Sequence, residues 1–439
     1  MLIETAESEE QADALRAEKH AHLIEADRAY KARRFDQWLA STSRASDPDW
    51  GVPSAHPAAS WDAVEFISSD MAAVLPTPKL SVGKAFYLRK LNTYCYGIYS
   101  GQADTHTLAF WSEKEAKKGS NEVISALHHH QLTRNTSATH LIAWGDNTSS
   151  QLKNQFVMLY RAELAHPGGL ALYERVDSKF GPPGHTFLDN DRAFGQLRQR
   201  ANKVQTLGST KAWLKLAQRA RVTPRFNATL LPQALFRDWK SYLRMLYETP
   251  AKRWTTLAGE TVRFLKIRSP HLTGYHHALY PAHAPYPHSP LPTRRWFNFG
   301  VGEDAQGQLV RHPDQVWFRY GLDPAEPWSV IQLTRRRGVP ANIDDDEFLL
   351  YNAPRAIDPK KAKDLAQMRQ WLAPEFHPLY PDPLPPAAPA PNGAGGDGDG
   401  AGEDEDQQLT DYDDEESSEV DEEEDADEHD GGAGEMDWD

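Results

Sequence analysis

Short runs rich in apolar residues recur along the chain between polar segments, a pattern that predicts the strands of a sheet. These runs are 64–70, 93–101, 105–113, 139–146 and 170–178. Apolar residues at helical spacing predict helices at 121–132, 150–165 and 191–204. Three strands, a helix, a strand, a helix, a strand and a closing helix form an α/β pattern. We therefore predict an α/β core with a mixed sheet flanked by helices, spanning residues 61–208.

The residues before this core predict a helix and a linker. Residues 5–40 have a helical composition with apolar residues along one face, so we expect an N-terminal helical segment at 1–40. Ser, Pro, Gly and Asp dominate the stretch that follows, which predicts a linker at 41–60.

The residues after the core change in character. We expect an appended helical and β-rich unit at 209–376, and a Pro- and Gly-rich linker with an acidic tail at 377–439. The tail has too few apolar residues to fold alone, so we expect it to be disordered. Within the appended unit, helices are predicted at 210–220, 231–247 and 359–372, and strands at 261–269, 315–322 and 328–337.

Charge is distributed unevenly along the 439 residues, whose formal net charge is −15. Residues 391–439 contain 23 Asp and Glu and no Lys or Arg, so the remaining chain holds 48 Lys and Arg against 40 acids. A basic body with an acidic tail favours a nucleic-acid partner, DNA rather than RNA. A charge of about +8 on 390 residues is also ordinary for a globular protein. Alternatively, the tail itself binds basic proteins such as histones.

Cysteine content and hydropathy narrow the compartment. The single cysteine, Cys95, excludes an intramolecular disulfide framework and a Cys-rich zinc module. No run reaches the roughly 18 apolar residues that span a bilayer, and the charged N-terminus lacks the apolar core of a signal peptide. We expect a cytoplasmic or nuclear protein, with the nucleus favoured, and no membrane partner.

Four acids lie at the ends of predicted elements, in the order strand, helix, strand, helix. They are Asp70, Glu122, Asp146 and Asp191. Carboxylate oxygens are the ligands that Mg²⁺ prefers, and two ions roughly 3.5–4 Å apart can activate a water and stabilise the leaving oxygen of a phosphodiester. We therefore predict a two-metal site for Mg²⁺ or Mn²⁺. Each acid alone could equally end a strand or complement a helix N-terminus, and Asp189 competes with Asp191 for its role.

The ordered motifs around these acids resemble a family of domains of unknown function. The motifs are SDMAAVLPTPKLSVGKAFYLRKLNTYCYGIY, WSEKEAKKGSNEVIS, GDNTSSQLKN, PPGHTFLDNDRAFG and KKAKDLAQMRQWLAPEFHPLY, over roughly residues 60–380. The family occurs in eukaryotic transposon-related proteins. The resemblance implies a ribonuclease-H-like core of the transposase and integrase type. It also implies that Asp70, Asp146 and Asp191 are metal-binding aspartates, with Glu122 in the family's shared helix.

Two positions depart from the family's pattern. Thr148 replaces a cysteine, and Arg198 stands seven residues beyond Asp191, where a glutamate is expected. A cation in place of an acid near the site makes a domesticated, inactive copy an open alternative.

Further residues complete the predicted site. His185 could orient a water or carry a proton, because imidazole titrates near neutral pH. The cations that could contact nucleic acid are Lys114, Lys117, Lys118, Lys153, Arg198, Arg335, Arg336 and Arg337. The histidine run 128–130 is expected to be exposed, and a zinc site among His276, His277, His283 and His288 lacks cysteine partners.

Together these observations predict metal-dependent phosphodiester chemistry, as a nuclease or by transposase-like strand transfer. The alternatives are an inactive nucleic-acid or chromatin-binding protein and a tail that binds basic proteins. If the site exists, Asp70 and Asp146 should end neighbouring strands, with Glu122 and Asp191 directed toward the same point and Asp189 facing solvent.

Overall fold

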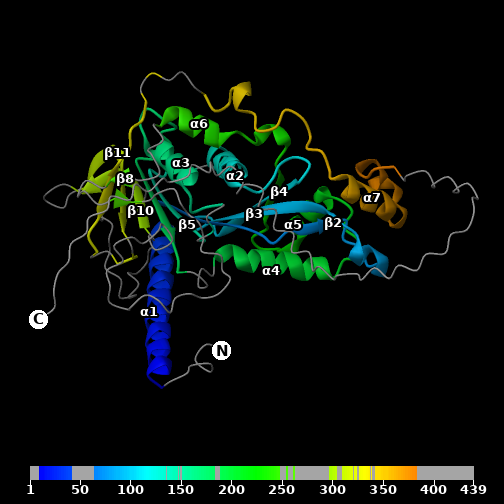
Figure 1. The fold of residues 1–439 in the computed structure, drawn as a ribbon, viewed down its shortest axis with the longest axis horizontal. Coiled ribbons are helices and arrows are strands. Elements are labelled where there is room, and N and C mark those ends of the chain that lie inside the picture. Colours follow the sequence, from blue (N-terminus) through cyan, green and yellow to red (C-terminus); the bar gives the residue numbers. More distant parts are fainter. Residues whose placement is uncertain are drawn as a thin grey trace, which may run out of the picture. The chain divides into compact units, whose positions relative to one another are not determined.

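A ten-stranded mixed sheet runs through the part of the chain that the structure describes (Figure 1). The structure is a computed structural model. It describes residues 9–41, 64–134, 136–146, 148, 151–182, 188–247, 254–255, 261–262, 296–303, 309–319, 321–323, 326–336, 338 and 342–382. These residues all lie in one unit, Met1–Leu384.

Five strands form the centre of the sheet in the order β4-β3-β1-β5-β6. They are β1 (Val64–Met71), β3 (Leu91–Ser100), β4 (Thr105–Ser112), β5 (His140–Gly145) and β6 (Arg175–Phe180). The first three are antiparallel neighbours, whereas β5 is parallel to β1 and β6 is parallel to β5. The mixed α/β core predicted from the order of strand-like and helical segments is therefore present.

Strands from the region beyond residue 208 extend this sheet at both edges. One edge gains β7 (Asn227–Leu230), and the other gains β10 (Trp296–Glu303), β11 (Leu309–Arg319) and β12 (Ser329–Gln332). The short strand β2 (Leu75–Thr77) pairs with the start of β3, and β8 (Trp254–Thr255) pairs with β9 (Thr261–Val262). The residues predicted to form an appended unit thus share the sheet of the core.

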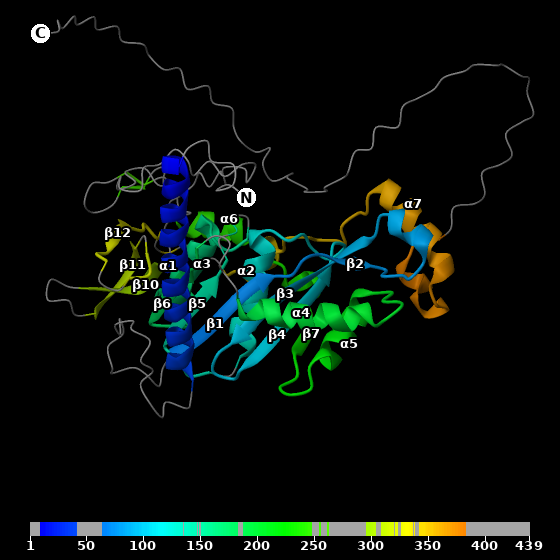
Figure 2. The same ribbon diagram turned by 90° about the horizontal axis from the view of Figure 1, so that it is seen from below.

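Helices cover both faces of the sheet (Figures 1 and 2). The first face packs on α2 (Ser120–Thr133), α3 (Gln155–Ala165) and α6 (Trp239–Leu246). The second face packs on α1 (Glu9–Ala40), α4 (Asp189–Asn202) and α5 (Thr210–Ala220). Beyond β2, α7 (Pro359–Met368) packs on the 3₁₀ helix η3 (Gly83–Tyr87). The other short 3₁₀ helices are η4 (Gln233–Leu235), η7 (Asp346–Phe348), η8 (Arg369–Trp371) and η9 (Pro374–Leu379).

The end of α1 is fixed to the sheet by a buried acid. Asp36 is 1% exposed and accepts hydrogen bonds from Trp144 Nε1 at 2.8 Å and Lys179 Nζ at 2.9 Å. Lys179 also lies over the ring of Trp296, 4.0 Å from its centroid. Because a buried charge without a partner is costly, this contact makes α1 part of the folded unit.

A second buried acid joins the added strand β10 to the core. Asp177 on β6 accepts hydrogen bonds from Trp296 Nε1 at 3.0 Å and Asn298 Nδ2 at 2.7 Å, both on β10. Burial alone would raise the pKa of Asp177, but Arg175 and His140 outweigh burial and hold this pKa well below its usual range. The ionised carboxylate therefore holds two neighbouring strands together.

The histidine run differs from its prediction. His128 and His130 are buried and His129 is partly buried, because α2 lies between the sheet, α3 and α6 and has few exposed positions. The ring of His128 packs edge-on against Trp239, with centroids 4.9 Å apart. The four later histidines lie outside the described residues. No helix in the described ranges is long and apolar enough to cross a bilayer.

Candidate active site

Asp70 and Asp146 end two adjacent parallel strands. Ser69 of β1 pairs in register with Gly145 of β5, and each aspartate is the next residue along its strand. Parallel neighbours lie about 4.8 Å apart, so the two carboxylates meet at the same edge of the sheet. The prediction that these acids end neighbouring strands is confirmed.

The N-terminus of α4 is attached to β1 at this edge. Asn190 Nδ2 donates a hydrogen bond of 2.9 Å to the carbonyl oxygen of Ser68. On the neighbouring strand β3, a Cβ added to Gly97 would lie 2.8 Å from the ring of Phe194, so only glycine permits this approach of the helix. Gly97 is also the register partner of Asp70. The close packing of α4 brings Asp191 to the site.

The three aspartates repel one another. Burial, followed by the charges of Asp146 and Asp191, raises the pKa of Asp70 to about 7. Burial also raises the pKa of Asp146, with Asp191 adding to this effect and a hydrogen bond from the Thr148 hydroxyl opposing it. These mutual effects identify Asp70, Asp146 and Asp191 as one acidic cluster. We call these three residues the aspartate cluster.

Asp191 and Asp189 share the first turn of α4, but Asp189 is the more buried of the two, which is the reverse of the predicted order. Asp191 Oδ2 accepts the backbone N–H of Leu188 at 2.9 Å, which caps the helix, and its side chain is exposed. Asp189 is partly buried and accepts a hydrogen bond of 3.2 Å from the hydroxyl of Ser68. The expectation that Asp189 faces solvent is therefore wrong, because Ser68 and the ring of His106 hold it against the sheet.

Glu122 is directed elsewhere. Its carboxylate accepts the backbone N–H groups of Gly119 at 2.9 Å and Lys117 at 3.1 Å, and the hydroxyl of Tyr351 at 2.7 Å. Its place in the first turn of α2 therefore serves the helix N-terminus, as in a capping box. The expectation that Glu122 points toward the aspartates is corrected: the acids whose charges act on Asp70 are Asp146 and Asp191.

The loop after β5 supports Asp146. Lys153 is 2% exposed, lies over the ring of Phe180 at 5.0 Å from its centroid, and lowers the pKa of Asp146 by its charge. Asn154 caps α3 by accepting the backbone N–H groups of Phe156 and Val157, both at 3.1 Å. Lys153 thus lies too deep to contact a phosphate. His185, the predicted proton carrier, lies outside the described residues.

The remaining predicted cations divide into exposed and internally bonded groups. Arg335 forms a two-point ion pair with the buried carboxylate of Glu163, with Nε 2.8 Å from Oε1 and Nη2 3.2 Å from Oε2. It is therefore a structural residue and not a phosphate contact. Lys114 Nζ donates to the carbonyl oxygen of Leu379 at 3.1 Å. Side chains of Lys117, Arg198 and Arg336 are exposed, Lys118 is partly buried, and Arg337 lies outside the described residues.

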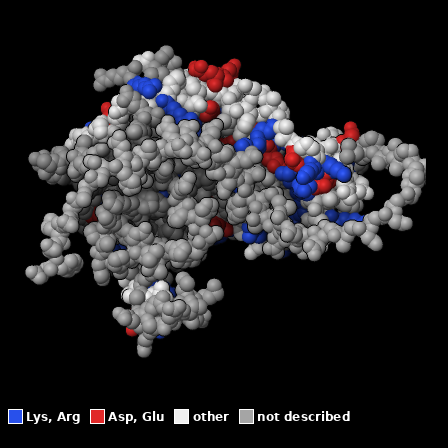
Figure 3. Space-filling model, viewed as in Figure 1, with Lys and Arg blue, Asp and Glu red and all other residues white. Residues whose placement is uncertain are grey.

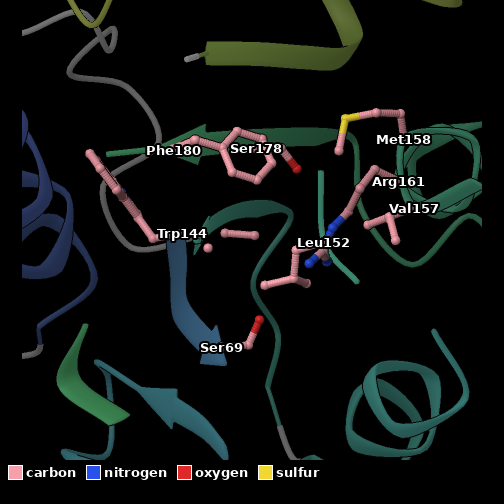
Figure 4. A pocket seen from close by; sticks show the side chains of 10 residues that line it. Ser69, Trp144, Leu152, Val157, Met158, Arg161, Ser178 and Phe180 are labelled. Carbon is pink, nitrogen blue, oxygen red and sulfur yellow. The ribbon is translucent and has the colours of Figure 1, made fainter. Parts of the chain in front are cut away.

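A small cavity lies beside the strand ends but on the side of α3 (Figure 4). Ser69, Ser178 and Arg161 line it, and Arg161 reaches toward Leu152 from α3. Ser69 and Asp70 are successive strand residues, so their side chains point to opposite faces of the sheet. The cavity has room for about one water molecule. It is therefore an internal feature of the core and not a substrate pocket.

The aspartate cluster offers suitable ligands for a hard cation. Asp146 Oδ1 is buried and has no hydrogen-bond partner among the residues that the structure describes. The charge of Asp191 also raises the pKa of both Asp70 and Asp146, and a hard cation such as Mg²⁺ or Mn²⁺ would relieve this repulsion. Within the described ranges, no three Asp, Glu, His or Cys side chains stand close enough together to hold an ion. The residue types therefore fit a metal site, without forming a finished coordination sphere.

Sequence reasoning missed the residues that position the cluster. Through the hydrogen bonds given above, Ser68 holds Asp189, and Asn190 holds the start of α4 on β1. The hydroxyl of Thr148 holds Asp146. Gly97 had a detectable signal, since a glycine inside a predicted strand indicates close approach of another element. Asn190 had none, because its partner is a backbone carbonyl 122 residues away.

The fold and this site define a mixed α/β protein with an acidic cluster at the carboxyl ends of two parallel strands. Residues 85–251 match the model of a family described as a domain of unknown function, DUF7869. That range extends from η3 to the end of α6 and includes Asp146 and Asp191, but it begins after Asp70.

Comparisons with curated proteins and with solved structures do not extend this family match. No curated protein matches the chain. Among solved structures, one similar chain comes from the cryoEM structure of the simian T-cell lymphotropic virus intasome in complex with PP2A regulatory subunit B56 gamma. The alignment covers 62% of this chain and 81% of that chain at 12% identity, with a TM-score of 0.21. A score this low carries no argument about fold or function.

Proposed function

We propose that this chain is a nucleic-acid-processing protein with a ribonuclease-H-like core, in which Asp70, Asp146 and Asp191 bind divalent cations for phosphodiester chemistry. The observation that carries the proposal is the meeting of Asp70 and Asp146 at the ends of adjacent parallel strands, with Asp191 acting on both. The reaction class is nuclease cleavage or strand transfer, and a transposon-derived origin rests on the sequence resemblance alone.

The strand order supports a ribonuclease-H-like core. Three antiparallel strands are followed by two strands parallel to the first, in the order β4-β3-β1-β5-β6. In chain order, α2 follows β4, α3 follows β5 and α4 follows β6. This arrangement is typical of ribonuclease-H-like domains, and it accounts for one aspartate on β1, one after β5 and one on α4.

The residues of the cluster have separable tasks in this proposal. Asp70, Asp146 and Asp191 would hold Mg²⁺ or Mn²⁺, which polarises a phosphodiester and makes water a better nucleophile when bound. The hydroxyl of Thr148 orients the carboxylate of Asp146 through its hydrogen bond. Asn190 keeps the start of α4 on β1, so that Asp191 stays beside the strand ends.

A second candidate function is nucleic-acid or chromatin binding without catalysis. Two observations favour it: Glu122 is committed to the N-terminus of α2, and Arg198 is an exposed cation on α4 where the related family has an acid. In this candidate the cluster of three acids lacks a fourth ligand and does not cleave, while exposed cations such as Arg198 bind the phosphate backbone.

Cleavage of labelled single-stranded and duplex DNA and RNA separates the two candidates. With Mg²⁺ or Mn²⁺, the wild-type protein should cleave and Asp146→Asn should not, because the amide keeps the shape and removes the charge that binds the ion. Asp13→Asn, at an exposed site on α1, is the matched control. Equal cleavage by wild type and Asp146→Asn would contradict the metal site. Binding without cleavage in either ion would favour the second candidate.

A further inference from the structure

Two aromatic side chains stand in solvent on η3. Phe86 is 77% exposed and Tyr87 is 86% exposed, the two largest exposed fractions among the large apolar residues described. Their rings lie edge to face, with centroids 5.2 Å apart. Exposed aromatic area of this size costs free energy in water, so an exposed pair of rings indicates a binding surface.

The backbone beneath these rings is held firmly. Ala85, between Lys84 and Phe86, is fully buried in the cluster that η3 shares with α7. Arg89 ties the end of the segment to Asp364 of α7, through its backbone N–H at 3.0 Å and Nη1 at 3.2 Å. The rings are thus presented by an anchored element.

The surroundings of the rings are basic. Residues 79–90 and 357–380 together contain eight Lys and Arg and three Asp and Glu. Arg89, Lys361 and Arg369 are paired with Asp364, Glu113 and Asp382, respectively. Lys84, Lys360 and Lys363 are exposed. Figure 3 shows Lys and Arg gathered at the end of the molecule where α7 lies, with a few acids among them.

Strand β3 connects the segment that carries the rings to the aspartate cluster. Asp70 is the register partner of Gly97, and β3 begins at Leu91, just after η3. Gly97 lies six residues after Leu91 along β3, a distance of roughly 20 Å at about 3.4 Å per residue. A strand of a few nucleotides could therefore contact both places, since single-strand sites commonly span about 4–16 nucleotides.

We propose that Phe86 and Tyr87 form a stacking platform for the bases of single-stranded nucleic acid, whose backbone is held by the surrounding lysines. Stacked bases need exposed ring faces and a basic border, and η3 with α7 provides both. A second copy of the chain fits less well, because two basic surfaces would repel. The proposal deepens the proposed function by naming a single strand as substrate, and it rests on that function for the chemical step alone.

Binding to a fluorescent single-stranded oligonucleotide and to the matching duplex, with EDTA present, tests the platform apart from catalysis. The double variant Phe86→Ala/Tyr87→Ala should bind the single strand roughly tenfold more weakly, with a smaller change for the duplex. The variant Phe86→Trp/Tyr87→Ala, which keeps one large ring, should bind the single strand more tightly than Phe86→Ala/Tyr87→Ala. Val222→Ala, at an exposed apolar residue elsewhere, is the control and should bind as wild type.

Three outcomes would overturn the platform. They are unchanged single-strand binding by the double variant, an equal loss for duplex and single strand, and self-association of the wild type that the double variant abolishes. Because binding is measured with EDTA present, a loss of cleavage in Asp146→Asn concerns the metal site and leaves the platform to be judged by the aromatic variants. Circular dichroism confirms that each variant is folded.

Discussion

Asp70 and Asp146 each stand one residue beyond a register pair, Ser69 and Gly145, on strands that run side by side in the same direction. The sheet therefore fixes the distance between the two carboxylates more firmly than any loop could. The fold keeps the two charges close together, where they repel each other. Burial and the charges of its neighbours raise the pKa of Asp70 to about 7. The first prediction concerns the stability that this repulsion removes.

Asp70→Asn should stabilise the protein at alkaline pH. A carboxyl group whose folded pKa lies above its unfolded value contributes stability that is present below about 4 and lost as the pH rises through about 7. The amide cannot ionise, so the variant should exceed the wild type by about 1–3 kcal/mol at pH 8 and by little at pH 4. Urea unfolding at both pH values measures this difference, and a variant no more stable at pH 8 would contradict it.

Divalent cations should raise the melting temperature of the wild type at pH 8. An ion that binds the folded state alone, at about 100 times its dissociation constant, adds about 2.7 kcal/mol. Thermal unfolding with and without Mn²⁺ should show this gain in wild type and in Asp13→Asn. The gain should be lost in Asp146→Asn, and its persistence there would place ion binding at another site.

His128 should make the protein sensitive to acid. Burial lowers the pKa of His128 to about 4, so its contribution to stability is present above about 6.5 and lost as the pH falls toward 4. Between about pH 6.5 and pH 4, the free energy of unfolding of His128→Phe should fall less than that of the wild type. His20→Phe, at an exposed position on α1, should leave this fall unchanged. Protonation of Asp70 raises stability over an overlapping pH range. The effect of His128 is therefore read from the difference between His128→Phe and the wild type, with His20→Phe as the control.

Arg335 and Arg336 should differ in their effect on stability. Arg335→Gln leaves the carboxylate of Glu163 buried without its ion pair and should cost about 3–5 kcal/mol. Arg336→Gln, at an exposed side chain, should change stability by less than about 0.5 kcal/mol. Equal effects of the two substitutions on denaturant midpoints would refute the structural role of Arg335.

Removal of residues 391–439 should tighten nucleic-acid binding at low salt. The 23 acids of this segment can compete with phosphate for the basic body, at an effective concentration of about 1 mM for a short tether. The gain should be several-fold at about 50 mM salt and should shrink as salt screens the charges. Unchanged affinity in low salt would instead favour a basic protein as the partner of the tail.

The sequence predicted the parts of the fold that depend on local pattern. Short apolar runs located β1 and β5, and with them Asp70 and Asp146 at the strand ends. It could not decide the role of Glu122, because a glutamate at the third position of a helix has the same pattern whether it caps the helix or binds a metal. Here the capping contacts prevail.

Long-range packing accounts for the other differences. The histidine run was expected on the surface because no single face of a helix can bury three successive residues. In the fold, α2 is covered on several sides, and both His128 and His130 become core residues. Likewise, nothing in the local pattern of β10 indicates that it pairs with β6, since that pairing joins segments more than a hundred residues apart.

The order of synthesis gives the network around Asp177 a kinetic consequence. Trp296 and Asn298, which donate to its carboxylate, follow it by 119 and 121 residues. At about 5–20 residues per second, a ribosome needs roughly 6–24 s to supply them. During that interval the edge of β6 is unpaired and its carboxylate lacks two of its donors. Slower translation lengthens this interval, during which the open strand edge could pair with another chain.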